Sequence, residues 1–403
     1  MNYRSILVTA LALGLSTTSV WSATSDNSTL EQGQYLVRAA DCAACHTKEG
    51  GTPYAGGAPI ATPFGTVYGT NITPDKEYGI GDYSADEFYH VLTEGELPDG
   101  TQLYPAMPYT AYHSIARSDS DAMYAYLMSL KPLNIEAPET DLSWPFSMRW
   151  TLNFWNLMFA GESPGDAKDQ SEQWQRGRYM VDVLGHCGEC HTPRNALGAL
   201  ERDNHLQGGV IAGYEAPSLT PDELADRGWT PEDLQTFLRE GMSDQGTMFS
   251  EMYTVFHHSS RYLRDEDLKA MSLYLMGENP PDARIVDAGN RAGADSPGRR
   301  HYLNVCAGCH GAQGEGVPHV AVAMEGNTTL RLDDGRNLVK VIYDGIGAQK
   351  FSGFERMQAM PGFADKLSSA EIAELVNYLR QTWGGLDATI DAAAVDELTA
   401  KNE

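Results

Sequence analysis

The pentapeptide C-x-x-C-H occurs three times in this 403-residue sequence and accounts for all six of its cysteines. The copies end at His46, His191 and His310, more than a hundred residues apart. A zinc ribbon joins two C-x-x-C pairs within a short span, so this spacing does not fit one zinc site. A disulfide framework, the usual role of paired cysteines in an exported protein, has no need of a histidine after every pair.

The motif is typical of covalent attachment of c-type haem. Two thiols on one short turn can add to the two vinyl groups of one porphyrin, and the adjacent histidine then reaches the iron from one side. Three copies that exhaust the cysteines therefore predict three covalent haems c. The residues expected to hold them are Cys42, Cys45, His46, Cys187, Cys190, His191, Cys306, Cys309 and His310.

Methionine on the other side of each iron would complete its coordination and suit electron transfer. In the first segment we expect Met107, and in the third Met360, because each precedes a proline that favours an extended loop able to cross a flat ring. Met324 and Met357 are alternatives to Met360 in the third segment.

The second segment offers more than one methionine as the distal ligand. The separation from His46 to Met107 is 61 residues, and that from His191 to Met252 is also 61. The equal spacing predicts Met252 as the ligand and leaves Met248 as the alternative.

The segments around the three motifs follow a common plan. Each begins with a short helical stretch that contains glycine and tyrosine, at Gly33, Gly177 and Gly298. Each closes with an amphipathic helix in which apolar residues recur with helical spacing. The closing patterns start at Met123, Met271 and Ile372. Little in the sequence favours strands, so we expect an all-α fold built from three tandem domains.

Two capping boxes are predicted at the starts of the closing helices. Ser368 with Glu371 forms one before the last closing helix, and Ser118 with Asp121 resembles one before the first.

The N-terminus has the pattern of an export signal: Arg4, an apolar run from residue 6 to 15, and small residues near Ala23. The apolar run is too short for a comfortable membrane span, and no later stretch is long enough. The predicted divisions are a signal peptide (1–23), the first domain (24–135), an aromatic connector (136–172), the second domain (173–277), a linker (278–296), the third domain (297–385) and a tail (386–403).

The charge balance is strongly acidic, with 29 basic and 55 acidic residues and a net charge of −26. Nucleic acid is therefore excluded as a partner, because phosphate binding needs a basic patch. The aromatic stretch 144–159 has two interpretations: packing between the first two domains, or docking onto a catalytic subunit or a membrane interface.

The sequence resembles the cytochrome c subunits of membrane-associated periplasmic dehydrogenases, the family that includes those of alcohol dehydrogenase and gluconate 2-dehydrogenase. The resemblance covers essentially the whole mature chain and rests on the three C-x-x-C-H motifs, "NITPD", "YPAMPY", "CHTPRN" and the aromatic connector. It implies three tandem class I cytochrome c domains, with His46, His191 and His310 as proximal ligands and Met107, Met252 and Met360 as distal ligands.

What the resemblance implies about function is an electron relay. A large catalytic subunit with pyrroloquinoline quinone or flavin would oxidise an alcohol, aldehyde, sugar or sugar acid, and this non-catalytic subunit would pass the electrons to ubiquinone. The location would be the periplasm, with peripheral membrane association. The alternatives are a multihaem peroxidase, which needs an open distal position, and a free-standing periplasmic carrier that serves a terminal oxidase.

Arg194, in "CHTPRN", is a further candidate site residue. Its planar guanidinium would suit a haem propionate, and the alternative is an ordinary surface arginine. Asn71 and Trp229 occupy loops that could also face a propionate.

Overall fold

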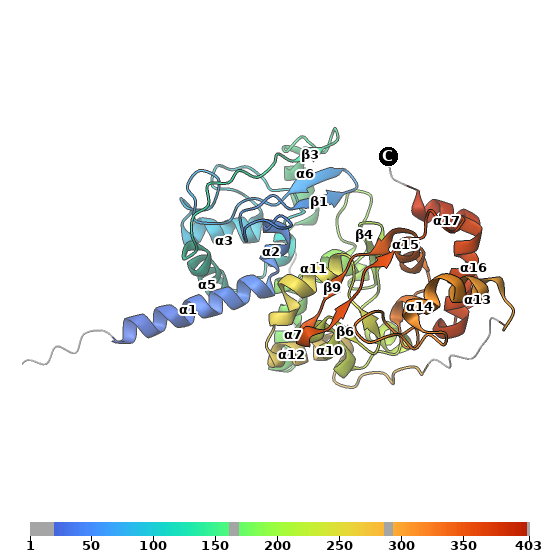
Figure 1. Ribbon diagram of the computed structural model, residues 1–403. Coiled ribbons are helices and arrows are strands. Elements are labelled where there is room, and N and C mark those ends of the chain that lie inside the picture. The colour runs from blue at the N-terminus through green and yellow to red at the C-terminus, as the bar shows by residue number, and fades with distance from the viewer. Residues whose placement is uncertain (1–19, 161–168, 286–292, 401–403) are drawn as a thin grey trace, which may run out of the picture.

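A computed structural model describes residues 20–160, 169–285 and 293–400 of the chain. We call the parts around the three C-x-x-C-H motifs the first, second and third domains, and the second lies between the other two (Figure 1). The expected all-α class is confirmed, because most of the regular structure is helical. Residues 1–19 of the expected signal peptide lie outside the described residues.

In each domain a helix before the C-x-x-C-H motif packs across the domain's closing helix. The pairs are α1 (Val20–Ala39) with α5 (Arg117–Met128), α7 (Glu172–Arg178) with α12 (Asp265–Met276), and α13 (Pro297–His301) with α16 (Ser369–Leu379). The three predicted closing helices are therefore present.

The predicted glycines lie where these helices cross. A Cβ atom added at Gly33, Gly177 or Gly298 would come within 2.2 Å of a backbone carbonyl oxygen of the closing helix. The same Cβ atom would also meet the Cβ of a tyrosine on that helix, at 2.5 to 2.9 Å. Glycine is required at these positions because the two backbones are in direct contact.

Capping differs from expectation at one helix. The box at Ser368 and Glu371 is confirmed. The box expected at Ser118 is wrong, because α5 begins at Arg117 after the uncapped Ala116, so that Ser118 lies within the first turn. Capping boxes at Ser84 and Thr230 begin α3 (Ala85–Glu94) and α10 (Pro231–Glu240), which occupy equivalent places in the first two domains.

The strands are short antiparallel ladders within loops. In the first domain β1 (Pro59–Thr62) pairs with β2 (Gly65–Tyr68), in the register of Pro59 opposite Tyr68. The connector adds β3 (Asp141–Leu142) to the other side of β2, which ties it back to the first domain. The remaining pairs are β4 (Gly209–Ile211) with β5 (Tyr214–Ala216), β6 (Met242–Ser243) with β7 (Gly246–Thr247), β8 (Gly345–Ile346) with β11 (Met360–Pro361), and β9 (Gln349–Lys350) with β10 (Arg356–Met357).

Further helices complete the domains and their connections. They are α4 (Tyr109–Tyr112), α6 (Thr151–Phe159), α9 (Pro221–Asp226), α11 (Glu251–His258), α15 (Arg336–Asp344) and α17 (Ala392–Thr399), with π-helical turns at η1 (Tyr179–Leu184), η4 (Tyr302–Cys306) and η7 (Arg380–Gly384) and 3-10 turns at η2 (Arg202–Asn204), η3 (Ser260–Tyr262), η5 (Thr328–Arg331) and η6 (Ser352–Phe354). Helix α17 lies in the predicted tail and packs against α15 and α16.

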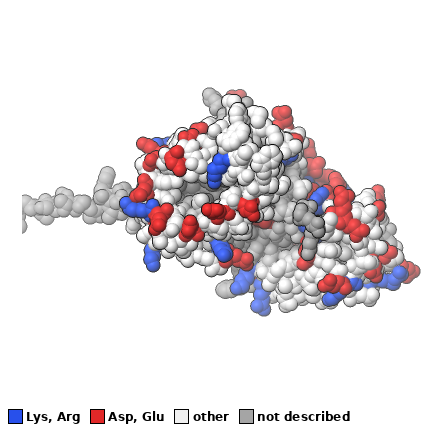
Figure 2. All heavy atoms as spheres, turned by 90° about the horizontal axis from the view of Figure 1, so that it is seen from above, with Lys and Arg blue, Asp and Glu red and all other residues white. Residues whose placement is uncertain are grey.

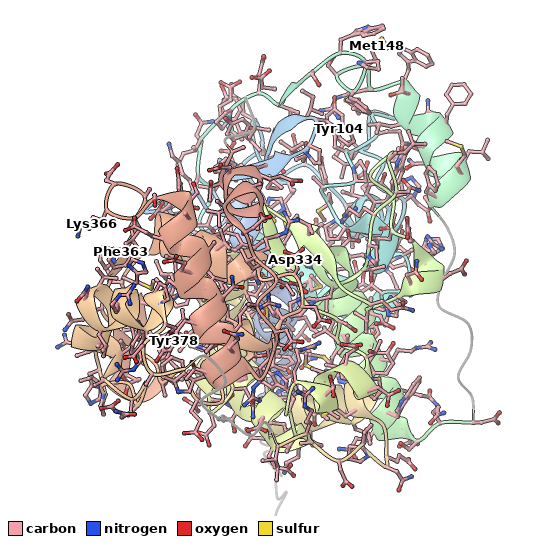
Figure 3. The ribbon with its side chains drawn as sticks, turned by 90° about the vertical axis from the view of Figure 1, so that its right-hand side faces the viewer. Tyr104, Met148, Asp334, Phe363, Lys366 and Tyr378 are labelled. Atoms are coloured by element: carbon pink, nitrogen blue, oxygen red, sulfur yellow. The ribbon has the colours of Figure 1, made fainter. Side chains whose placement is uncertain are left out.

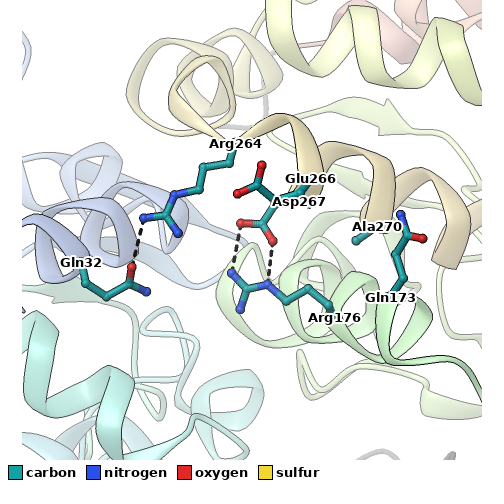
Figure 4. A pocket seen from close by; sticks show the side chains of 7 residues that line it. All are labelled: Gln32, Gln173, Arg176, Arg264, Glu266, Asp267 and Ala270. Atoms are coloured by element: carbon teal, nitrogen blue, oxygen red, sulfur yellow. Dashed lines mark hydrogen bonds and ion pairs between the residues drawn. The ribbon is translucent and has the colours of Figure 1, made fainter.

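The first two domains share one hydrophobic core. At its edge, buried Asp267 on α12 accepts hydrogen bonds from the Tyr35 hydroxyl of the first domain and from Arg176, whose Nε lies 2.6 Å from its carboxylate. Arg264 extends over the Tyr35 ring, 4.0 Å from its centroid, and donates to Gln32 (Figure 4). These contacts fix the two domains against each other.

The second and third domains meet through polar contacts. The Asn337 amide accepts from the Glu215 backbone N–H and donates to the Glu215 carbonyl, both at 2.8 Å. Tyr253 is bonded through its hydroxyl to both backbone groups of Lys350. Within the described residues no helix is both long and apolar enough to cross a membrane.

The glycine crossings generate a stability prediction. Gly177→Ala would place a methyl group 1.9 Å from the Ala270 carbonyl oxygen, so the helices must separate. We expect a loss of roughly 1–3 kcal/mol or more, although alanine normally favours a helix. Denaturant unfolding followed by circular dichroism measures this loss. Gly347→Ala is the control, since its Cβ meets nothing within 4 Å, and equal stability of the two variants would contradict the prediction.

The stability of the protein should depend on pH through a carboxyl group at the interface of the second and third domains. Burial, aided by Asp334, raises the pKa of Glu215 to about 7. The folded chain therefore binds this proton more tightly than the unfolded chain, and stability falls as the pH rises from 4.5 to 7. Glu215→Gln should remove that dependence and stabilise the protein at pH 8 by roughly 1–3 kcal/mol. This range is lower than the full pKa shift would give, because the Glu215 side chain is partly exposed and solvent screens its charge.

The measurement is the free energy of unfolding of wild type and variant at pH 5 and pH 8. Glu278→Gln, at an exposed position, serves as the control. A Glu215→Gln variant with the same pH dependence as wild type would show that this carboxyl does not control the interface.

Candidate haem-attachment sites

Each C-x-x-C-H motif lies on a short helix. These helices are α2 (Cys42–His46), α8 (Gly188–His191) and α14 (Ala307–His310), and the last two begin directly after the first cysteine of their motifs. One helical turn places residues three apart on the same face, so the two thiols of each motif point to one side. All six cysteines lie in the described part of the chain, and none is joined to another.

The three histidines are held in the same way. Their Nδ1 atoms lie 2.6 Å from the carbonyl oxygen of Thr70, 2.7 Å from that of Pro217 and 2.9 Å from that of Val322, for His46, His191 and His310 respectively. A carbonyl only accepts, so Nδ1 carries the proton and donates. The lone pair of each imidazole is therefore on Nε2, where it can bind a metal.

Sequence reasoning did not identify these carbonyl groups. A signal was present in two domains, because Thr70 and Pro217 directly precede the similar stretches "NITPD" and "SLTPD". The distance along the chain from the histidine is 24 and 26 residues in these domains and 12 in the third. The third loop is thus shorter, although it ends with the same hydrogen bond.

Burial sets the protonation of these groups. It lowers the pKa of His46, His191 and His310, which favours the neutral ring that a metal requires. It raises the pKa of Cys42, Cys45, Cys187 and Cys306 to about 12 and that of Cys190 to about 11, so these thiols stay protonated. Such cysteines are not poised as nucleophilic thiolates.

The expected methionines occupy equivalent positions in the first two domains. Gly95 ends α3, and its carbonyl accepts from the Leu103 N–H; Gly241 ends α10, and its carbonyl accepts from the Met248 N–H. Met248 therefore corresponds to Leu103. The residues four positions further on are Met107 and Met252, the two methionines that equal spacing paired.

Met248 is more deeply buried than Met252. It is 1 % exposed and belongs to an apolar cluster with Phe256 and Phe351. Met252 and Met357 are half-buried against the same cluster. In the third domain, Met360 pairs with Ile346 in a short ladder and packs against the core that contains Cys306 and Met324. The assignment of distal ligands stays a prediction.

The first and second sites adjoin each other across the shared core. In the first domain α4 follows Met107, and its Tyr112 ring meets the ring of His186, which precedes the second motif, at 5.7 Å between centroids. Thr110 also donates to Glu189, within that motif. In the second domain α11 contains Met252 and packs against α2 of the first. Each domain thus covers part of the other's attachment segment.

The third site is linked to the second through the loop of β9. Gln349 donates from its amide to the Met248 carbonyl at 3.0 Å, and the Phe351 ring lies against Phe256. The second domain therefore contacts both the first and the third.

The other predicted residues have protein partners. Arg194 donates to the Glu189 carboxylate and to the carbonyls of Glu189 and Gly198, and its role toward a propionate stays a prediction. Asn71 donates to the carbonyls of Leu133 and Ile135 at the end of the first domain, and Trp229 of the second domain donates to Thr328 of the third. The contacts of Asn71 and of Trp229 join separate parts of the chain, which gives both residues a structural role.

The residues of these sites fit haem c. In each motif two unpaired thiols lie on one turn, and the next residue is a histidine with Nε2 available.

Comparison with known proteins agrees with this geometry. A family model described as cytochrome c matches residues 30–131 and 296–383. The alcohol dehydrogenase (quinone) cytochrome c subunit of Gluconobacter oxydans is 37 % identical over 96 % of this chain and 86 % of its own. The gluconate 2-dehydrogenase cytochrome c subunit of Pantoea cypripedii is 36 % identical over 97 % and 94 %. The fructose dehydrogenase cytochrome subunit of Gluconobacter japonicus is 34 % identical over 92 % and 82 %.

The chain belongs to the cytochrome c family, which implies covalently bound haem c. Within that family it belongs with the cytochrome c subunits of alcohol and gluconate 2-dehydrogenases.

Proposed function

We propose that this chain is the electron-transfer subunit of a dehydrogenase complex and carries three covalent haems c. The observation that supports this most directly is the threefold recurrence of one arrangement. In each domain a C-x-x-C-H turn is followed by a loop whose carbonyl accepts from the histidine Nδ1. The three haem domains would be 24–135, 173–277 and 297–385.

In this proposal four residues of each domain would hold the haem. The two cysteines of a motif would form thioether bonds, and the histidine Nε2 together with Met107, Met252 or Met360 would bind the iron. Haem iron supplies one-electron redox chemistry when bound. The surrounding cores keep water away, and methionine favours a high reduction potential.

The partner and acceptor are inferred from the relatives. Their names place them in dehydrogenases for alcohol, gluconate and fructose, and the first is a quinone-linked enzyme. We infer a large catalytic subunit, with pyrroloquinoline quinone or flavin, as the electron donor and ubiquinone as the acceptor. The complex would work in the periplasm, after export by residues 1–23, with the subunit peripherally bound to the membrane.

A multihaem peroxidase is the second candidate. It needs one iron with an open distal face. The half-buried methionines Met107, Met252 and Met360, one in each domain, favour the relay instead.

Two matched variants, at Met252 and at Met248, test which methionine is the distal ligand in the second domain. Met252→Leu should lower the potential of one haem by on the order of 0.1 V or more, because a sulfur ligand is lost. Met248→Leu should leave all three potentials unchanged, since leucine fills a similar volume in the apolar cluster. Redox titration and electron paramagnetic resonance measure both. The reverse result would assign Met248.

The relay itself is tested in the complex of this chain with its large subunit. Wild type should contain three haems per chain, and substrate should reduce all three and then a ubiquinone analogue. Cys187→Ala with Cys190→Ala should leave two haems and abolish quinone reduction, because the second domain contacts both of the others and would carry the middle haem of the relay. Dye reduction by the large subunit should continue.

Two results would overturn the proposal. One is a wild-type chain with fewer than three haems, measured by intact mass and haem absorbance. The other is a two-haem variant that reduces quinone at the wild-type rate.

A further inference from the structure

The exposed apolar side chains of this protein are concentrated in one place. In the part of the chain that the structure describes, twelve large apolar side chains are exposed. Six of them lie on or beside α6: Trp144, Trp150, Phe154, Leu157, Met158 and Leu197. Trp144 is 79 % exposed and Leu157 is 84 % exposed, so these side chains are almost fully in contact with solvent. A gathering of this kind marks an interaction surface.

Four of the six form one surface because of helical geometry. Trp150, Phe154, Leu157 and Met158 are spaced by four, three and one residues, which places them along one side of α6. The Trp150 and Phe154 rings meet edge to face, 6.0 Å apart. We call this surface the α6 face.

The opposite side of α6 is firmly attached to the protein. Leu152 is buried, and Asn156 is bonded to the Tyr109 hydroxyl and to the Gln102 side chain, both at 2.7 Å. The Trp155 indole donates to the Leu197 carbonyl of the second domain. The α6 face is therefore presented by a fixed helix.

The α6 helix covers the loop that contains Met107. Tyr104, in this loop, donates to the Ser147 carbonyl, and its ring lies 4.6 Å below the Arg149 guanidinium. Figure 3 shows Met148 of the same segment at the outer edge of the molecule. A partner on the α6 face would therefore approach the first domain.

The charge around this face differs from that of the whole chain. Residues 142–161 contain no aspartate or glutamate and one charged residue, Arg149, although the net charge of the chain is −26. Arg149 lies just before α6, and Arg202 donates to the Phe159 carbonyl at its other end. Figure 2 looks down on the side where Figure 1 shows α6 and β3, and a broad area there lacks coloured side chains.

We propose that the α6 face is the surface by which this subunit lies on a lipid bilayer that contains anionic lipids. An interfacial helix carries tryptophan, phenylalanine and leucine on one side and basic residues near the headgroups, as here. Indole rings prefer the membrane–water interface. The inference rests on the proposed function, since a lipid-soluble acceptor must be reached from the membrane surface.

The composition favours a bilayer over a protein partner. A protein interface of ordinary size makes about one hydrogen bond per 100–200 Å² and has a polar rim. The α6 face is almost entirely apolar, with Asn153 as its exposed polar side chain in the helix. An acidic protein could approach an anionic bilayer only by a surface from which carboxylates are absent.

The test is co-sedimentation of the haem-loaded full chain with phosphatidylcholine vesicles, with and without phosphatidylglycerol. Wild type should bind, and more strongly with the anionic lipid and at low salt. The variant Trp150→Ser, Phe154→Ser, Leu157→Ser should bind about tenfold or more weakly. The matched control is Ile135→Ser, Val210→Ser, Ile285→Ser, which removes three exposed apolar side chains elsewhere and should bind as wild type does.

The haem content of each variant shows whether it has folded. Leu157→Asp serves as a second variant, because it changes the most exposed side chain of the face and leaves the inner contacts of α6 intact. Loss of vesicle binding in both variants at normal haem content supports the proposal.

Two outcomes overturn it. In the first, the variants bind vesicles as wild type does. In the second, they lose co-purification with the large subunit and keep their vesicle binding, which would assign the α6 face to a protein partner. Failure of the relay is a separate result, because vesicle binding does not depend on quinone reduction.

Discussion

The hydrogen bond from each motif histidine to a backbone carbonyl is the constraint on which the sites depend. It places the proton on Nδ1, so Nε2 is free to bind a metal, and it fixes the ring against rotation. It also ties the loop after the motif to the attachment helix, at Thr70, Pro217 and Val322. The loops differ in length and sequence, but the end point of each is the same.

The first two domains pack together so that each covers part of the other's attachment site. The first two domains are joined by a common core and by Asp267, whose partners come from both. The segments after Met107 and Met252 each contact the other domain, so neither site is completed by its own domain alone. The third domain is joined to the second by polar contacts such as that of Asn337 with Glu215 and by the apolar cluster of Phe351 with Met248 and Phe256. The raised pKa of the Glu215 carboxyl makes this interface sensitive to pH.

Much of the fold and of the sites could be predicted from the sequence, because these features depend on the identity of particular side chains. The C-x-x-C-H motifs, the glycines at the crossings and the spacing to Met252 are all visible in the sequence. The carbonyl of Val322 was not visible, because any residue has a carbonyl group, and those of Thr70 and Pro217 were marked only by the similar stretches that follow them. The cap predicted at Ser118 was wrong because a serine before an acidic residue occurs both at a helix cap and inside a helix. In the structure the N-cap residue is Ala116, two residues earlier. The stretch around Trp150 was visibly aromatic, but its outward orientation depends on contacts of Asn156 and Leu152 that only the folded chain makes.

The helix crossings also determine when each domain can close as the chain folds. The last residues of α5, α12 and α16 follow the motif histidines by 82, 85 and 69 residues, and a crossing cannot form until these helices are on the same side of the membrane as the motif. In a chain exported unfolded, as residues 1–23 predict, the cysteines stay on an open chain until then. That interval is available to a haem-attaching enzyme, and formation of the glycine contact ends it.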